Sequence, residues 1–436
     1  MTPPEEELQL SSDAVERMGS ELSTAVVPSR PRVGPSAAAP EYRVWDFEDG
    51  KGTAWVFPVN GRDAAITNPV MFSDGFEGKP SSVDDWLVLW RDDSEPVDPE
   101  QPPHYPWGKD LHAAGKDVII LGYADRKASI LDNARIARAC IRRVIEEREG
   151  DTPLVVGGFS MGGLITRYAL ALMETEGEPH ETSTYFSYDS PHRGGWVPIS
   201  VQAFAHFMAS RFPNVPAAAA MSEMLNSPAS RQMALYHIST HKDNPQAAAP
   251  DPLRDSFLAE LERVGWFPKQ VTKRVGVANG PGNGDVRALP ANNKTLECDT
   301  LALDVLLYGQ APADQHLVAK LTARSDTFDV KTTGVPALDG APGGTLQTNG
   351  IAVNALKALF PNAPRTAFPW VCFVPTVSAV DVADPKDFAT DPIPDAPPQG
   401  CGLHAYKCAT ASDDPKHYAH TLLTEELCTW LLNNFE

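Results

Sequence analysis

The chain has 436 residues, enough for one large α/β domain with insertions or for two smaller domains. Its 37 basic and 57 acidic residues give a formal net charge of −20. That charge argues against nucleic acid as a partner, because such binding depends on neutralising phosphates with Lys and Arg, and equally against docking on anionic lipid. The sequence contains no run of about 18 apolar residues, so no transmembrane segment is predicted. The composition therefore predicts a globular protein that binds neither nucleic acid nor anionic lipid.

The expected location and redox state follow from the N-terminus and the cysteines. The acidic start MTPPEEELQL lacks the basic segment and apolar run of a secretory signal, so the default expectation is a cytoplasmic protein. A processed terminus leaves secretion open. Six cysteines at this length do not form a disulfide framework, although Cys401 and Cys408 lie close enough in sequence to bridge in an oxidising compartment. Reduced thiols are the expectation.

Residues 1–40 are rich in acidic residues, Ser, Ala and Pro, a composition that buries little apolar surface and predicts a mobile tail. Residues 41–436 form the expected domain. Its first half alternates β-rich and helical patterns. The expected strands are 41–48 and 52–60 (a hairpin), 68–73, 116–125, 152–160 and 183–190, and the expected helices are 82–93, 130–149 and 161–174. Such alternation predicts a mostly parallel sheet with helices on both faces.

Between one strand and the next helix stands Gly158-Phe159-Ser160-Met161-Gly162, the pattern G-x-S-x-G. In this strand–helix context the pattern indicates a nucleophile elbow, a sharp turn that lifts the Ser160 hydroxyl above the sheet edge. Glycines two residues on either side are needed because a Cβ there would collide with neighbouring elements. Ser160 is the candidate nucleophile.

The segments VVGGFSMGGLITRYAL and TYFSYDSPHRGG resemble the elbow, its following helix and the next strand of the lipase- and esterase-like branch of the α/β-hydrolase superfamily. The resemblance covers roughly residues 41–195 and the last 65 or so. It implies an α/β-hydrolase fold with a mostly parallel central sheet. It also implies an oxyanion hole from the amides of Met161, after the nucleophile, and Phe76, in the loop Ser73-Asp74-Gly75-Phe76. Asp74 stands where the family usually has His.

A general base must remove the proton of the serine hydroxyl. In this fold the histidine comes last in the chain, on a loop after the final strand. His420 directly precedes an apolar terminal helix and matches best, with His417 as the alternative, whereas His192 is expected to be a turn residue.

The acid that orients the imidazole is the most open assignment. Some lipases carry it at the end of the strand after the elbow, which corresponds to Asp189. Asp381, beyond the segment VCFVPTVSA, is the runner-up, and Asp285 and Asp339 are further carboxylates near strand ends. The alternative is that Asp189 only braces its turn through hydrogen bonds.

Two insertions are expected. Residues 196–266 are rich in Ala, Met, Phe and Pro and lie where such hydrolases place a helical cap or lid. Met and Phe at helical spacing are nevertheless more often core than substrate wall. Residues 295–335 predict a β-rich excursion, interpreted as extra strands at the sheet edge.

These residues predict a serine hydrolase that cleaves a small-molecule or lipid-like carboxylic ester through an acyl-enzyme. No cofactor and no metal are expected, because the aspartates of 381–395 lack a ligand pattern. One alternative is a thioesterase or acyltransferase with the same triad. Another is a catalytically silent hydrolase fold that serves as a binding module.

Overall fold

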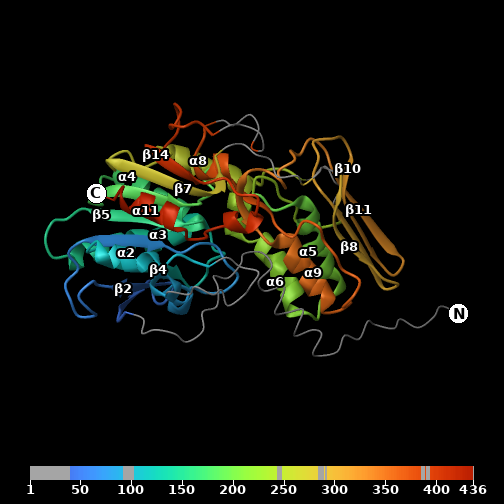
Figure 1. Cartoon of the computed structure of the whole chain (residues 1–436), viewed down its shortest axis with the longest axis horizontal. Coiled ribbons are helices and arrows are strands. Elements are labelled where there is room, and N and C mark those ends of the chain that lie inside the picture. The colour runs from blue at the N-terminus through green and yellow to red at the C-terminus, as the bar shows by residue number, and fades with distance from the viewer. Residues whose placement is uncertain are drawn as a thin grey trace.

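The computed structural model describes residues 40–91, 103–242, 248–282, 289, 292–383, 388 and 393–435. The expected tail over 1–40 therefore lies almost wholly outside the described residues. Figure 1 shows a main sheet flanked by helices on one side of the molecule and a second group of helices with its own sheet on the other.

The main sheet has eight strands in the order β1-β2-β4-β3-β5-β6-β7-β14. Its strands are β1 (Arg43–Phe47), β2 (Gly52–Phe57), β3 (Pro69–Ser73), β4 (Asp117–Tyr123), β5 (Leu154–Phe159), β6 (Thr182–Tyr188), β7 (Lys273–Pro281) and β14 (Ala405–Ala409). β2 pairs antiparallel with both β1 and β4, and the other pairings are parallel. This order, with one antiparallel strand near the edge, identifies the α/β-hydrolase fold.

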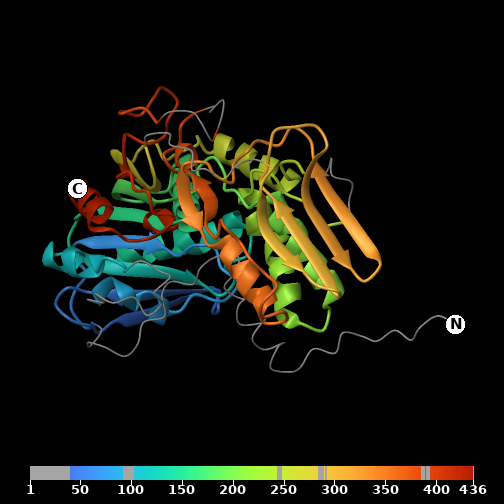
Figure 2. The same ribbon diagram turned by 45° about the vertical axis from the view of Figure 1, so that its right-hand side comes forward.

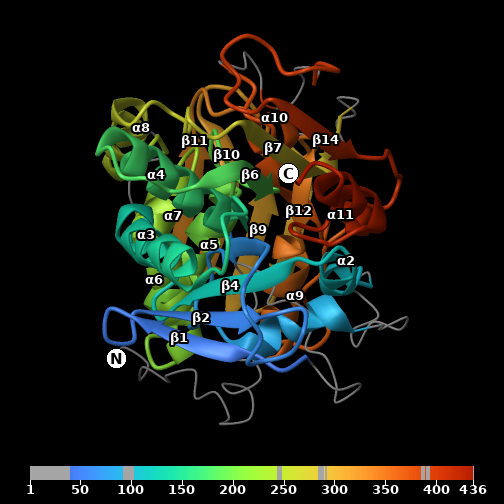
Figure 3. The same ribbon diagram turned by 90° about the vertical axis from the view of Figure 1, so that its left-hand side faces the viewer.

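Helices cover both faces of the main sheet (Figure 3). α3 (Ile130–Glu147) and α4 (Met161–Thr175) pack on one face, and α2 (Trp107–Ala113) and α11 (Glu425–Leu432) pack on the other. α3 buries a stripe of apolar side chains at three- and four-residue spacing, as expected for an amphipathic helix. The expected helix over 82–93 is instead two 3-10 turns, η1 (Val83–Asp85) and η2 (Leu87–Trp90).

A helical insertion separates β6 from β7. Its helices are α5 (Ile199–Arg211), α6 (Pro216–Leu225), α7 (Pro228–Met233) and α8 (Pro252–Arg263). The first ten residues of α5 are all buried, so its Met and Phe side chains are core of the second lobe.

Four strands after β7 form a sheet of their own instead of extending the edge of the main sheet. They are β8 (Lys294–Asp299), β9 (Leu303–Tyr308), β10 (His316–Ala323) and β11 (Asp326–Thr332), all antiparallel. The edge position beside β7 is taken by β14, and the inner residues of β9 (Leu303, Val305, Leu307) are buried against the helical insertion. Figure 2 shows this sheet lying over the helices. The expectation of extra strands at the edge of the main sheet was wrong.

The chain then returns through β12 (Gly343–Leu346), α9 (Thr348–Lys357), β13 (Val371–Pro375), α10 (Thr376–Ala379), β14 and η4 (Pro415–Tyr418) to α11. β12 and β13 pair antiparallel outside the main sheet. All six cysteines are free thiols, and burial raises the pKa of Cys401 to about 11 and that of Cys408 to about 12. Among the described residues, no helix is long and apolar enough to cross a membrane.

Candidate active site

Ser160 occupies the turn between β5 and α4 with φ 53° and ψ −126°, a backbone conformation that costs energy for any residue with a Cβ. The flanking glycines allow the turn. A Cβ on Gly158 would lie 2.3 Å from the carbonyl carbon of Gly162, and a Cβ on Gly162 would lie 2.1 Å from the Ser73 carbonyl oxygen. The elbow can therefore form only with glycine at both positions, and it directs the Ser160 side chain out of the sheet.

Ser160, His420 and Asp189 form one buried chain of hydrogen bonds. Ser160 Oγ lies 2.7 Å from His420 Nε2, and His420 Nδ1 donates to Asp189 Oδ2 at 2.7 Å. Two residues of β7 fix Asp189. Its Oδ1 accepts a hydrogen bond from the backbone amide of Asn279 at 3.0 Å, and its own backbone amide donates to the Val277 carbonyl. Asp189 is fully buried, whereas Ser160 is 8% exposed.

His420 is held by residues outside the main sheet. Its amide donates to the carbonyl of Thr345 on β12 at 2.9 Å. The Phe373 ring on β13 meets the imidazole edge-on at 4.9 Å between centroids. The two-stranded sheet of β12 and β13 thus forms part of the site, a role with no signal in the sequence pattern.

The alternative histidine lies elsewhere. His417 is exposed and its Nδ1 is 2.6 Å from the Ser412 hydroxyl. His192 is buried in a turn after β6, between Ser187 and Arg167, and burial lowers its pKa well below the usual value.

The alternative carboxylates are also occupied elsewhere. Asp381 lies 2.6 Å from Arg193 and accepts from the Gly402 amide and the Trp266 indole. Burial raises its pKa despite the neighbouring guanidinium groups. The Asp339 carboxylate accepts hydrogen bonds from the Trp196 indole and from the backbone amide of Gln310. Asp285 lies outside the described residues.

The loop after β3 passes directly over the elbow. A Cβ on Gly75 would lie 3.1 Å from Ser160 Cβ and 3.7 Å from the Met161 amide nitrogen. Met161 opens α4, so its amide has no acceptor within the helix. Phe76 lines the same small cavity as Ser160 and His420, and its amide donates to no acceptor within the described part of the chain. Within the described residues, the Met161 amide beside Ser160 and the Phe76 amide in the loop above it are thus both free of hydrogen-bond acceptors.

The cavity at Ser160 is small, about 30 Å³, and polar side chains as well as Phe76 and Phe159 form its walls. Asp74, Glu77, Asp85 and Arg126 line it together with Thr421. Such a volume holds about two water molecules. Only a small group fits beside Ser160 without movement of the walls.

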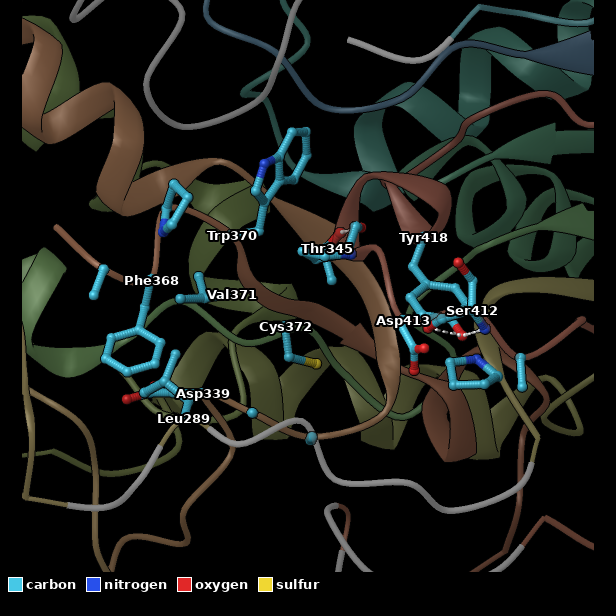
Figure 4. A pocket seen from close by; sticks show the side chains of 17 residues that line it. Leu289, Asp339, Thr345, Phe368, Trp370, Val371, Cys372, Ser412, Asp413 and Tyr418 are labelled. Atoms are coloured by element: carbon cyan, nitrogen blue, oxygen red, sulfur yellow. Dashed lines mark hydrogen bonds between the residues drawn. The ribbon is translucent and has the colours of Figure 1, made fainter. Parts of the chain in front are cut away.

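A second cavity of about 640 Å³ adjoins the loop that carries His420. Phe368, Trp370 and Tyr418 give it aromatic walls, and Cys372 lies between them (Figure 4). No basic side chain is among its described lining residues. Within the described residues, no cluster of three or more His, Cys, Asp or Glu side chains is arranged to hold a metal ion.

No model of a known protein family and no curated protein sequence matches the chain. Solved structures do match. The mature lipase BlEst2 of Bacillus licheniformis is 14% identical, with a TM-score of 0.32 and coverage of 53% of this chain and 73% of that one. The Pyrobaculum calidifontis esterase is 11% identical, with a TM-score of 0.34 and coverage of 60% and 72%. A hormone-sensitive lipase from a metagenome library is 12% identical, with a TM-score of 0.33 and coverage of 60% and 68%.

Proposed function

We propose that the protein is a serine hydrolase that cleaves carboxylic esters through an acyl-enzyme. The observation that carries this proposal is the continuous hydrogen-bonded chain from Ser160 through His420 to Asp189, beside two free amides on an α/β-hydrolase fold. A serine alone is a weak nucleophile, and this arrangement supplies the base and the oxyanion donors that it lacks.

In the proposed mechanism His420 Nε2 takes the proton of Ser160 as Oγ attacks the ester carbonyl. The amides of Met161 and Phe76 stabilise the negative charge of the tetrahedral intermediate. Asp189 keeps the imidazole in the tautomer with the proton on Nδ1 and stabilises the imidazolium. His420 then protonates the leaving alcohol, and water, activated by the same histidine, releases the acid.

Hydrolysis of p-nitrophenyl esters of increasing acyl length tests the proposal. Because the cavity at Ser160 holds only about 30 Å³, we expect kcat/KM to be highest for acetyl to butyryl esters and at least about tenfold lower for dodecanoyl esters. Matched acyl thioesters and an added alcohol acceptor complete the test. Turnover only of thioesters, or only with the acceptor, would favour a thioesterase or a transferase, and no turnover at all would favour a binding module.

Gly344 on β12 offers a second test, because it packs on the triad carboxylate. A Cβ on Gly344 would lie 2.0 Å from Asp189 Oδ2. Gly344→Ala should therefore displace Asp189 and lower kcat about 100-fold, since misplacing a catalytic group by about 1 Å can cost that much. Steady-state kinetics and a thermal unfolding curve measure the two effects separately.

Gly195→Ala is the matched control, because a Cβ there would make only ordinary contacts, 3.4 Å from the Phe373 carbonyl oxygen and 3.9 Å from Pro191 Cβ. It should leave kcat within about threefold of the unmodified protein. Unchanged kcat in a folded Gly344→Ala variant would contradict the role of Asp189.

A further inference from the structure

Arg126 is a buried arginine just beyond the end of β4, and its guanidinium is directed entirely at the loop over Ser160. Its Nε donates to the Gly75 carbonyl at 2.6 Å, Nη1 to Glu77 at 2.6 Å and Nη2 to Asp74 at 3.0 Å. Its side chain is 6% exposed, and it lines the small cavity at Ser160. Three directed bonds from one rigid group bind three of four consecutive residues of this loop.

The first of these bonds bears on the oxyanion hole through the peptide group itself. The Gly75 carbonyl and the Phe76 amide belong to the same peptide unit, which is planar with C=O and N–H pointing in opposite directions. A donor that fixes the carbonyl therefore also fixes the direction of the N–H. The bond also polarises the peptide, which makes its N–H a stronger donor.

The Asp74 carboxylate holds the preceding peptide unit. Its Oδ1 accepts the Gly75 amide at 2.8 Å as well as Arg126, and its Oδ2 accepts the Ser81 hydroxyl at 2.8 Å. A histidine at this position could not accept all three bonds, because its ring has at most one acceptor nitrogen. The carboxylate at position 74 and the arginine at position 126 thus act as one unit.

The segment that carries Arg126 is anchored by α7 of the helical insertion. The Ala229 amide donates to the Lys127 carbonyl at 3.1 Å. Gln232 accepts from the Ile130 amide at 2.8 Å and donates to the Ser129 hydroxyl at 3.0 Å. The helical insertion is therefore linked to the loop over Ser160 through Arg126 and the residues that directly follow it.

The geometry points to Arg126 as a positioning residue that, together with Asp74, aligns the Phe76 amide toward the oxyanion. This inference rests on the proposed ester hydrolysis. Arg126 does not donate to the oxyanion in this arrangement, because its bonds are directed at the loop. It acts on catalysis through the Phe76 amide.

Arg126→Met tests the inference with a pair of substrates, a p-nitrophenyl ester and the matching thionoester with C=S in place of C=O. Sulfur is a weak hydrogen-bond acceptor, so the thionoester gains little from an oxyanion hole. We expect Arg126→Met to lower kcat for the ester about 10- to 100-fold, with a smaller change in KM, and to lower kcat for the thionoester by less than about threefold. The ratio of the two rates should fall accordingly.

Arg138→Met is the matched control, because Arg138 also pairs with two carboxylates, Glu176 and Glu178, but lies on the outer side of α3. It should leave both rates unchanged. If Arg126→Met does not fold, as judged by thermal unfolding, Arg126→Lys serves in its place. Its compact ammonium cannot reproduce the three bonds of the planar fork, and the ratio should again fall.

An equal loss with both substrates in a folded variant would show a merely structural role and overturn the inference. An unchanged ester rate would do the same. Absence of ester turnover by the unmodified protein is a different result, because it would reject the proposed function and not the role of Arg126 within it.

Discussion

Replacing Ser160 with alanine is expected to lower kcat for p-nitrophenyl butyrate by about 10⁴- to 10⁶-fold. The expected loss is large because Ser160 Oγ forms the ester bond of the proposed acyl-enzyme. Without it, His420 and Asp189 have no nucleophile to activate. It corresponds to about 5–8 kcal/mol of transition-state stabilisation. Residual hydrolysis above the uncatalysed rate should remain, because the two amides still stabilise the oxyanion during attack by water.

Labelling by a fluorophosphonate probe provides an independent measurement, since the probe forms a covalent bond only with an activated nucleophile. The intact protein should be labelled at one site and the Ser160→Ala variant should not. Ser190→Ala is the control. Ser190 is buried close to the elbow, where a Cβ on Gly163 would lie 2.1 Å from its Oγ, and within the described residues that Oγ has no hydrogen-bond partner. Labelling that persists in Ser160→Ala, or is lost in Ser190→Ala, would place the nucleophile elsewhere.

The sequence predicts the parts of the fold whose signal is local. β5, the elbow and α4 follow one another within 22 residues, from Leu154 to Thr175, and a buried strand, a glycine pattern and an amphipathic helix can each be recognised there. The sequence does not predict β14, because its five residues, including Lys407, are all half-buried and form no apolar run. That β8–β11 form a separate sheet is not predicted for another reason. Strand patterns predict strands but not which sheet they join.

The parts of the site that depend on distant contacts were less predictable. Arg126 and Asp74 are 52 positions apart and meet because β3 and β4 are parallel neighbours, with both residues just beyond their ends. The support of His420 by Thr345 depends on β12, which does not belong to the main sheet. Neither contact leaves a pattern in one sequence.

The sequence offers two main candidates for the acid, Asp189 and Asp381, and their burial and backbone conformation do not separate them. Asp189 and Asp381 are both fully buried, and both have positive φ, 47° and 54°. They differ in what they contact. Asp189 Oδ2 lies 2.7 Å from His420, whereas the carboxylate of Asp381 lies 2.6 Å from Arg193. That difference predicts opposite effects of the same substitution at the two positions.

Asp189→Asn is expected to lower kcat about 10⁴-fold, with the protein still folded. The asparagine amide can donate to His420 Nδ1, which would favour the tautomer with the proton on Nε2 and leave no acceptor for the Ser160 proton. Asp381→Asn should instead leave kcat within about threefold and lower the free energy of unfolding. Breaking a buried ion pair typically costs about 3–5 kcal/mol. We expect the lower end, because burial raises the pKa of Asp381 and its charge is therefore costly to keep in the folded state.

Kinetics and urea unfolding of the two variants, measured side by side, decide between the carboxylates. Both effects must be measured in both variants, since replacing a buried aspartate can lower activity simply by unfolding the protein. Asp189→Asn should change the rate far more than the stability, and Asp381→Asn should do the reverse. If Asp381→Asn lost kcat about 10⁴-fold while Asp189→Asn retained it, the hydrogen bond to His420 would not be the one that supports catalysis. Equal loss of stability with retained kcat in both variants would mean that Asp189 only braces its turn.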